Sequence, residues 1–210
     1  MIRESTVDCG GRAAALVEAI DPALLRDPID FLLADHYRLS AVLNLIDKLA
    51  RDRTSSEVRR RIANAVLAFF CVDLAQHVED EERDLFPLLR KRLARSATLP
   101  GVLEQVQAEH EADDRALRLL TAMLSKLAAR PGTTPSNGFR VAAAGFVQAL
   151  RCHLAWENAV VMPLLRTHLK RSDLRALTRH MAARRGIKPS RPLRRAGEKL
   201  ALQPGQRLQR

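Results

Sequence analysis

The 210-residue chain has little cysteine, few aromatic side chains and no long uninterrupted apolar run. Its three cysteines, Cys9, Cys71 and Cys152, are far apart and form no CxxC pair. This argues against a disulfide framework and against a thiolate metal site. No segment approaches the roughly 18 consecutive apolar residues of a membrane-spanning helix, and the first residues lead into no apolar signal-peptide core. We therefore expect a cytoplasmic protein without a membrane span.

Positive charge is unevenly distributed along the chain. The formal net charge is +11, but the stretch from Arg184 to Arg210 holds nine Lys or Arg and one acid, which leaves only +3 for the rest. Residues 185–210 also contain several prolines and glycines, and no aromatic side chain that stacks on bases. We expect a mostly disordered basic tail. It either binds nucleic acid, an acidic membrane surface or an acidic partner, or is solvated with no dedicated partner.

Helix start and stop signals divide the rest of the chain. Asp27-Pro28 is a typical helix start, with an N-cap aspartate before a proline at the first helical position. Thr54-Ser55-Ser56-Glu57 has the spacing of a capping box, and Ser172-Asp173 is a further capping signal. No alternating strand pattern is present. The pattern predicts an all-α protein with helices over about 27–51, 54–95 (kinked at Pro87), 100–129, 138–170 and 172–184.

These signals also predict the domain organisation. Residues 1–26 form an N-terminal extension, 27–170 a helical bundle, 171–184 a short helix and 185–210 the basic tail.

Apolar residues recur at steps of three and four in the four long helices, and each stripe is interrupted by a histidine at a comparable level. The stripes comprise Leu32, His36, Leu39, Leu43 and Ile46; Phe70, Leu74, His77, Glu81, Leu85 and Leu88; Leu103, Val106, His110, Asp113, Leu117, Leu120 and Leu124; and Phe146, Leu150, His153, Glu157, Val160 and Leu164. Four such stripes joined by short loops predict an up-down antiparallel four-helix bundle.

The two halves of the bundle repeat each other. His77 is followed after four residues by Glu81, and His153 is followed after four residues by Glu157; in both cases a proline lies ten residues after the histidine. His36 precedes His77 by 41 residues, and His110 precedes His153 by 43. The spacing predicts two helical hairpins related by a pseudo-twofold axis, with four imidazoles and two carboxylates at the centre.

Buried imidazoles and carboxylates are costly unless they are paired or bind a metal. A single histidine on an apolar stripe is usually a core residue, but four at one level with two glutamates favour a metal site. Nitrogen and oxygen donors without thiolate suit iron, manganese or zinc. Two ions about 3.5–4 Å apart can share carboxylates as bridges, and this donor set leaves coordination positions open, unlike a structural zinc site.

The residues His36, His77-x-x-x-Glu81, His110 and His153-x-x-x-Glu157 resemble the hemerythrin-like HHE cation-binding domain over about 27–169. The resemblance implies a four-helix bundle with two non-haem iron ions joined by an oxo or hydroxo bridge. The four histidines would be terminal ligands, and Glu81 and Glu157 the bridging carboxylates. Manganese and zinc are the alternatives to iron.

The resemblance also implies a class of function: binding or sensing oxygen, peroxide or nitric oxide in stress or iron homeostasis. Asp114 stands where oxygen-carrying hemerythrins have a second histidine, and Glu157 follows His153 by four residues where they have an aspartate at five. The set is similar to bacterial iron-centre repair proteins and eukaryotic iron-sensing domains. The alternatives are therefore an iron donor for damaged clusters, a peroxide-consuming di-iron enzyme, and a regulator that acts on nucleic acid or a partner through the tail.

The sequence also suggests roles for residues near the ligand set. Asp113 or Asp114, about one turn after His110, is a candidate hydrogen-bond acceptor for an imidazole, with a solvated surface acid as the alternative. Glu82 and Glu111 adjoin ligands in the chain, and we expect them to point away as surface charges. Cys71 and Cys152 are expected to be small buried residues.

Overall fold

The computed structural model describes residues 16–51, 54–94, 99–130 and 132–187, and these parts form helices and their connections without a strand. The all-α prediction is confirmed. Residues 1–15 and 188–210, and with them nearly all of the predicted basic tail, lie outside the described parts.

The first long helix, α1 (Pro28–Arg51), starts at the predicted signal. Oδ1 of Asp27 accepts hydrogen bonds from the backbone N–H groups of Ile29 (3.0 Å) and Asp30 (3.2 Å). Pro28 stands at the first helical position, where its missing N–H would have no helical partner. Local chemistry therefore accounts for this boundary.

The second long helix is continuous from Ser56 to Arg92. It consists of α2 (Ser56–Phe69), the π-helical turn η3 (Phe70–Leu74), α3 (Ala75–Asp80), the π-helical turn η4 (Glu81–Leu85) and α4 (Phe86–Arg92). The predicted capping box is wrong by one residue, because Ser55 is the N-cap and accepts from the N–H of Val58 at 3.4 Å.

The remaining helices are α5 (Leu99–Ala129), α6 (Asn137–Trp156), the π-helical turn η5 (Glu157–Val161), α7 (Met162–His168) and α8 (Arg171–Arg184). Ser136 caps α6 by accepting from the N–H of Phe139 at 3.1 Å. The predicted cap of the last helix is wrong. Lys170 is its N-cap, and the carboxylate of Asp173 reaches back to the N–H of Lys170 at 2.9 Å.

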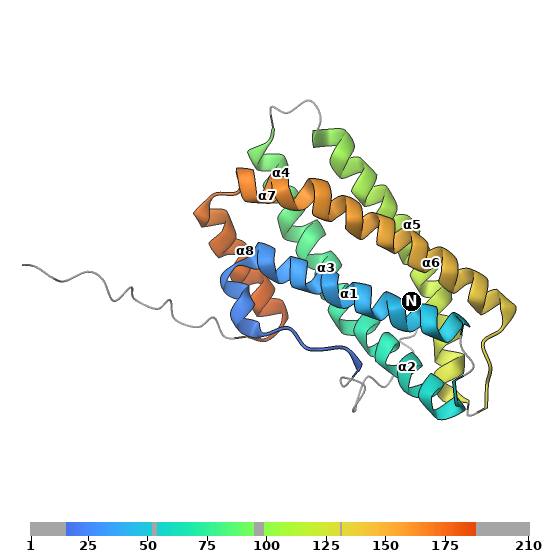
Figure 1. Cartoon of the computed structure of the whole chain (residues 1–210). Helices are drawn as coiled ribbons and strands as arrows, with labels where there is room; N and C mark the ends of the chain where they lie inside the picture. The colour runs from blue at the N-terminus through green and yellow to red at the C-terminus, as the bar shows by residue number, and fades with distance from the viewer. Residues whose placement is uncertain (1–15, 52–53, 95–98, 131, 188–210) are drawn as a thin grey trace, which may run out of the picture.

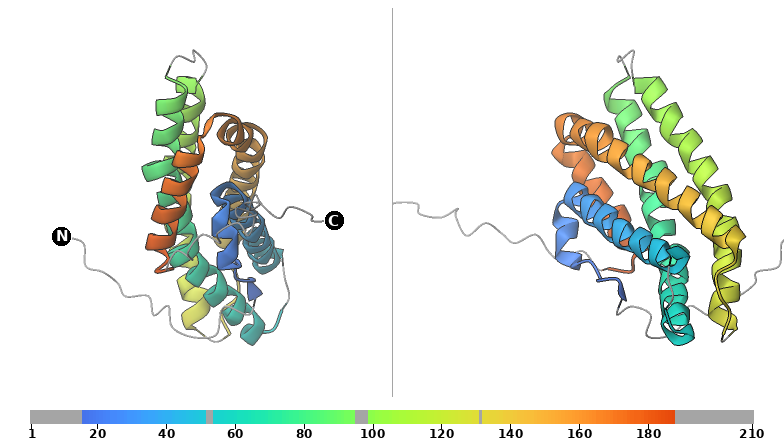
Figure 2. Two further views of the ribbon diagram at one scale, coloured as in Figure 1. Left: turned by 90° about the vertical axis from the view of Figure 1, so that its left-hand side faces the viewer. Right: turned by 45° about the vertical axis from the view of Figure 1, so that its right-hand side comes forward.

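The four long helices form a closed ring of neighbours (Figure 1). α1 packs against α2 and α6, and α5 packs against the same two helices; α4 and α7 are neighbours further along. Two further elements cover one side of this bundle (Figure 2). The 3-10 helix η2 (Pro22–Arg26) packs on α1, and α8 packs on α1, α3 and η2.

The core consists of two apolar clusters with a polar layer between them. One cluster includes Leu39, Leu43 and Phe146, and the other includes Leu32, Phe86 and Leu165. Along α1, His36 lies between Leu32 of one cluster and Leu39 of the other.

One helix, Ser56–Arg92, is long and apolar enough to cross a membrane when judged by length and composition alone, with a mean hydropathy of 1.3 in its most apolar window. Half of that window is buried inside the bundle. The same helix carries His77 and Glu81, and many of its apolar residues pack in the core.

Candidate metal centre

The structure brings all six predicted site residues together in the polar layer. His36 comes from α1, His77 and Glu81 from the second long helix, His110 from α5, and His153 and Glu157 from the fourth. Every one is less than one-tenth exposed, and both glutamates are fully buried. The i, i+4 spacing places each glutamate one turn after its histidine on the same helix face.

Both glutamates begin a π-helical turn. The N–H of Phe86 bonds to the carbonyl of Glu81, and the N–H of Met162 to the carbonyl of Glu157, each five residues back. A π-helical turn adds one residue to the helix, and such turns are frequent at functional sites.

The added residue changes which side chains face the core afterwards. The sequence pattern expects Leu88, Val160 and Leu164 in the core, but these are only half-buried. The following residues, Leu89, Val161 and Leu165, are fully buried instead. These three expectations of the α-helical period are therefore wrong by one position.

The carboxylate of Glu81 faces histidines from both halves of the site. Its Oε1 lies 3.4 Å from Nε2 of His77 and 3.9 Å from Nε2 of His36. Its Oε2 lies 3.5 Å from Nε2 of His110. We call His36 and His77 the first histidine pair, and His110 and His153 the second histidine pair. One oxygen of Glu81 therefore faces the first pair, and the other faces the second.

The carboxylate of Glu157 repeats this arrangement. Its Oε2 lies 3.5 Å from Nε2 of His36, and its Oε1 lies 3.4 Å from Nε2 of His153. Each pair thus has one oxygen of each glutamate beside it, which is the arrangement that two bridging carboxylates require for two adjacent ions.

Whether a metal ion fits this site can be judged from the hydrogen bonding of the buried oxygens of Glu81 and Glu157. All four, together with Nε2 of His36, are buried and have no hydrogen-bond partner within the described residues. Buried polar atoms are rarely left unpaired, because their desolvation costs free energy. Potential ligand atoms of His36, His77, Glu81 and Glu157 lie within 4.8 Å of one another, as do those of His110, His153 and Glu157. The donors therefore fit a metal cation.

The second imidazole nitrogens have partners that also follow the pseudo-twofold relation. Nδ1 of His36 lies 2.8 Å from Oδ1 of Asn158, and Nδ1 of His110 lies 3.0 Å from Oε1 of Glu82. Asn158 and Glu82 each follow a glutamate of the ligand set directly. Such acceptors fix the imidazole tautomer so that Nε2 presents its lone pair to a metal.

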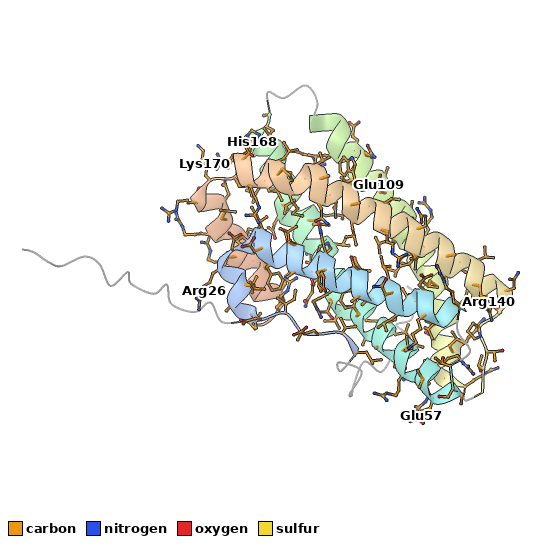
Figure 3. The ribbon with its side chains drawn as sticks, in the orientation of Figure 1. Arg26, Glu57, Glu109, Arg140, His168 and Lys170 are labelled. Carbon is orange, nitrogen blue, oxygen red and sulfur yellow. The ribbon has the colours of Figure 1, made fainter. Side chains whose placement is uncertain are left out.

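The other two histidines face acidic residues that directly precede a ligand in the chain. Nδ1 of His153 lies 2.9 Å from Oε2 of Glu109 on α5, which Figure 3 labels beside α6. Nδ1 of His77 faces Oδ2 of Asp35 at 3.6 Å, a distance of an ion pair rather than of a hydrogen bond.

In the metal-free site, the pKa values of the two buried glutamates move in opposite directions. Burial, together with the charge of Glu157, raises the pKa of Glu81 to about 8. Burial alone would raise the pKa of Glu157 as well, but the His153 imidazole 3.4 Å away lowers it to about 2. Burial would lower the pKa of His153, but the nearby carboxylate of Glu157 and the hydrogen bond to Glu109 raise it to about 9. One carboxylate therefore keeps a proton that a cation would displace.

A cavity of about 410 Å³ adjoins the layer. Four members of the ligand set line it: His77, Glu81, His110 and His153. Its remaining wall is mainly apolar, with Leu39, Phe70, Leu74, Val78, Leu117, Phe146, Leu150 and Leu154. A small molecule that enters this cavity reaches the second histidine pair from inside the bundle.

Two expectations about neighbouring residues, those for Glu82 and for the two cysteines, are wrong, and of the two alternatives for Asp114 the surface acid is the one that holds. Glu82 is the acceptor for His110, although it adjoins Glu81 and was expected to point away. The candidate acceptors Asp113 and Asp114 line the cavity instead, and Asp114 also pairs with Arg118. Glu111 is exposed as expected, whereas Cys71 and Cys152 are exposed rather than buried.

An all-α bundle with a buried cluster of four histidines and two glutamates defines a metal-binding helical-bundle protein. Comparison with protein families agrees with this class. The model of the hemerythrin HHE cation binding domain matches residues 27–165, about two-thirds of the chain, and the chain belongs to this family. The family resemblance seen in the sequence is confirmed. A search of curated proteins gives no match.

Proposed function

We propose that the chain holds two non-haem iron ions, one beside each histidine pair, and that it binds or senses oxygen, peroxide or nitric oxide. The carrying observation is that all four oxygens of Glu81 and Glu157 are buried without a hydrogen-bond partner in the described parts and face Nε2 atoms of both pairs. Imidazole and carboxylate donors suit iron. Iron, when bound, supplies one-electron redox chemistry and open positions for small ligands.

The chain's own residues account for orientation and access. Asn158, Glu82 and Glu109 hold three of the imidazoles through Nδ1. The apolar wall of the cavity limits water beside the second histidine pair, which favours small uncharged ligands over ions. The acidic side chains Asp113 and Asp114 on the same wall add negative charge there, which opposes the entry of anions.

The first test is the metal content and visible absorption spectrum of the protein purified in air and after anaerobic loading with Fe²⁺. We expect about two irons per chain and ferric charge-transfer bands, with spectral changes when nitric oxide, peroxide or oxygen is added to the reduced form. Zinc or manganese as the resident metal, or no metal after loading, would refute the iron proposal.

A matched pair of variants separates the site from general effects. Glu81→Gln removes a bridging carboxylate and should lower metal affinity by more than the roughly 100-fold effect of outer partners. Glu111→Gln makes the same chemical change at an exposed residue next to a ligand and should bind metal as the wild type does. Equal metal binding by the two variants would contradict the assignment of Glu81.

A further inference from the structure

The C-terminal end of α8 brings two arginines to buried acids beside the ligand set. Nη2 of Arg185 lies 2.7 Å from Oδ2 of Asp80 and 3.7 Å from Oδ2 of Asp35. Nε of Arg184 lies 3.0 Å from Oδ1 of Asp80. Asp80 is fully buried, and Asp35 is 4% exposed. Both acids directly precede a member of the ligand set, because Asp35 adjoins His36 and Asp80 adjoins Glu81.

Asp35 connects Arg185 to the first histidine pair. Its Oδ2 faces both Nδ1 of His77 at 3.6 Å and the Arg185 guanidinium, while its Oδ1 bonds to Arg38 at 2.9 Å. The Arg185 guanidinium also lies over the ring of Phe31, 4.8 Å from its centroid, which fixes its position. A buried carboxylate between two guanidiniums has little freedom to turn away from the imidazole that it faces.

The corresponding acid in the other half is held differently. Glu109 occupies the place of Asp35 in the repeat and bonds to His153, but its side chain is 34% exposed. α8 packs on α1, α3 and η4, which carry the Asp35 side of the layer. The pseudo-twofold relation therefore holds for the ligands and for the positions of the residues that face their Nδ1 atoms, although Asp35 lies at ion-pair distance from His77 whereas Glu109 hydrogen-bonds to His153. It fails at the arginines.

We propose that Arg185 is a positioning residue that fixes His77 through Asp35 and thereby makes the metal position at the first histidine pair the tighter of the two. The inference rests on the proposed pair of metal ions. α8 lies outside the matched residues 27–165, so the device is a feature of this chain beyond the family domain. The cavity is lined by both members of the second histidine pair and by His77 alone of the first, so the second pair is left as the more exchangeable position.

The test is the release of Co²⁺ from the fully loaded, full-length protein to an excess of chelator, followed by visible absorption. The wild type should lose its two ions in two phases. Removing an outer partner of a metal ligand costs roughly 10–100-fold in affinity, so Arg185→Gln should speed the slow phase by about 10-fold and leave the fast phase unchanged. Arg179→Gln, the same change at an exposed position of α8, should release both ions as the wild type does.

A double-variant cycle tests the route through Asp35. Asp35→Asn alone should speed the slow phase, and Arg185→Gln added to Asp35→Asn should produce little further change. His180→Ala, which removes the exposed contact of α8 with Asp84 at 2.6 Å, should leave the slow phase as it is. Additive effects of the Asp35 and Arg185 changes would overturn the proposed route.

Loss of Arg185 leaves Asp80 buried with one cation fewer, so the substitution is also made in an Asp80→Asn background to keep the protein folded. Circular dichroism of the metal-free variants checks this. Unchanged slow release, or equal acceleration of both phases, would overturn the inference. A wild type that never takes up two ions would instead refute the proposed metal pair on which the inference rests.

Discussion

At the scale of residues, the site is a set of buried groups that the fold leaves without partners. A buried carboxylate normally costs several kcal/mol unless it is neutralised or paired, and here Glu81 and Glu157 lie in the same layer. The raised pKa of Glu81 shows one solution, the uptake of a proton. A bound cation is the other solution, so protons and metal compete for the same atoms.

This competition predicts that metal affinity rises steeply with pH. In the metal-free protein Glu81, with a pKa of about 8, and His153, with a pKa of about 9, are protonated at pH 7. Binding must displace both protons, so affinity should increase by up to about 100-fold per pH unit below pH 8 and level off above about pH 9. Competition with a chelator at several pH values measures it.

The number of protons released is a second, independent readout. Calorimetric titration with Zn²⁺ in two buffers of different ionisation enthalpy should give close to two protons per fully loaded chain near pH 7. His180→Ala, which removes an exposed histidine away from the layer, should give the same number. Affinity that does not change between pH 6 and 8 would contradict the prediction.

The six clustered residues could be predicted because histidine and glutamate are conspicuous on an apolar stripe, and because the i, i+4 repeat puts each pair on one face. Their acceptors could not be predicted in the same way. Glu82 and Glu109 each bond to a histidine of a different helix, so their roles depend on how the helices are aligned with one another. A single-helix pattern contains no information on this alignment.

At the scale of elements, the π-helical turns explain where the helical period fails. One added residue after Glu81 and one after Glu157 move the core positions from Leu88 and Leu164 to Leu89 and Leu165. The one residue added by each π-helical turn cannot be recognised in the hydrophobic pattern. The reason is that Leu88 and Leu89, and likewise Leu164 and Leu165, are both apolar. The helices themselves were predictable, but these internal shifts were not.

Deleting Arg83, an exposed residue inside η4, tests the π-helical turn. The deletion should convert the turn to α-helix while Phe86 and Leu89 keep their places in the core. Without Arg83, these two become the fourth and seventh residues after Glu81, which an α-helix puts on the same face as Glu81. We expect a folded protein, judged by circular dichroism and cooperative thermal unfolding, with weakened metal binding because the backbone that carries Glu81 changes.

A deletion in a regular helix is the matched control. Gln148 is exposed in α6, and its removal rotates the preceding core residues by about 100° relative to His153. This variant should fail to fold cooperatively. If both deletions unfold the protein equally, the π-helical turn is not a separable feature.

The attachment of α8 provides a second prediction at this scale. Asp173 bonds to Arg92 of α4 through both carboxylate oxygens, at 2.6 and 2.7 Å. These bonds lower the pKa of Asp173, so the stabilisation is present above the unfolded pKa of about 3.9 and is lost as the pH falls through the lower folded value. Asp173→Asn should therefore lower the Tm by about 2–4 °C at pH 7, and the difference should shrink below pH 4.

Thermal unfolding of the metal-free protein at several pH values measures this effect. Asp114→Asn removes an exposed partner of Arg118 and should not change the Tm. A difference between Asp173→Asn and wild type that grows as the pH falls would contradict the assigned sign.

At the scale of the whole molecule, charge and metal chemistry are separated along the chain. The match to the family model ends at residue 165, and α8 (Arg171–Arg184) follows it; Arg184 and Arg185 pair with buried acids beside the first histidine pair. Residues 188–210 carry seven Lys or Arg and one Glu. Arg184 and Arg185 were counted with the basic tail in the sequence, yet they pair with buried acids of the bundle. The boundary between bundle and tail therefore falls after them.

This boundary fixes how the basic segment should be tested. Removing residues 188–210 takes away a net charge of +6 and leaves every described ion pair intact. We expect the full chain to bind duplex DNA in a salt-sensitive way, because each neutralised phosphate releases counterions. With about five phosphates neutralised, affinity should fall by roughly 100-fold or more between 50 and 200 mM salt. Fluorescence anisotropy of a labelled duplex measures both the affinity and its slope with salt.

The shortened chain should lose this binding and keep its full metal content. Removing residues 1–15, whose formal charges cancel, is the control for truncation itself and should leave DNA affinity unchanged. If DNA affinity survives the loss of residues 188–210, the positive charge that matters lies on the bundle. If the affinity of the full chain does not change with salt, phosphate contacts do not drive binding, because an electrostatic interaction of this kind always weakens as salt rises.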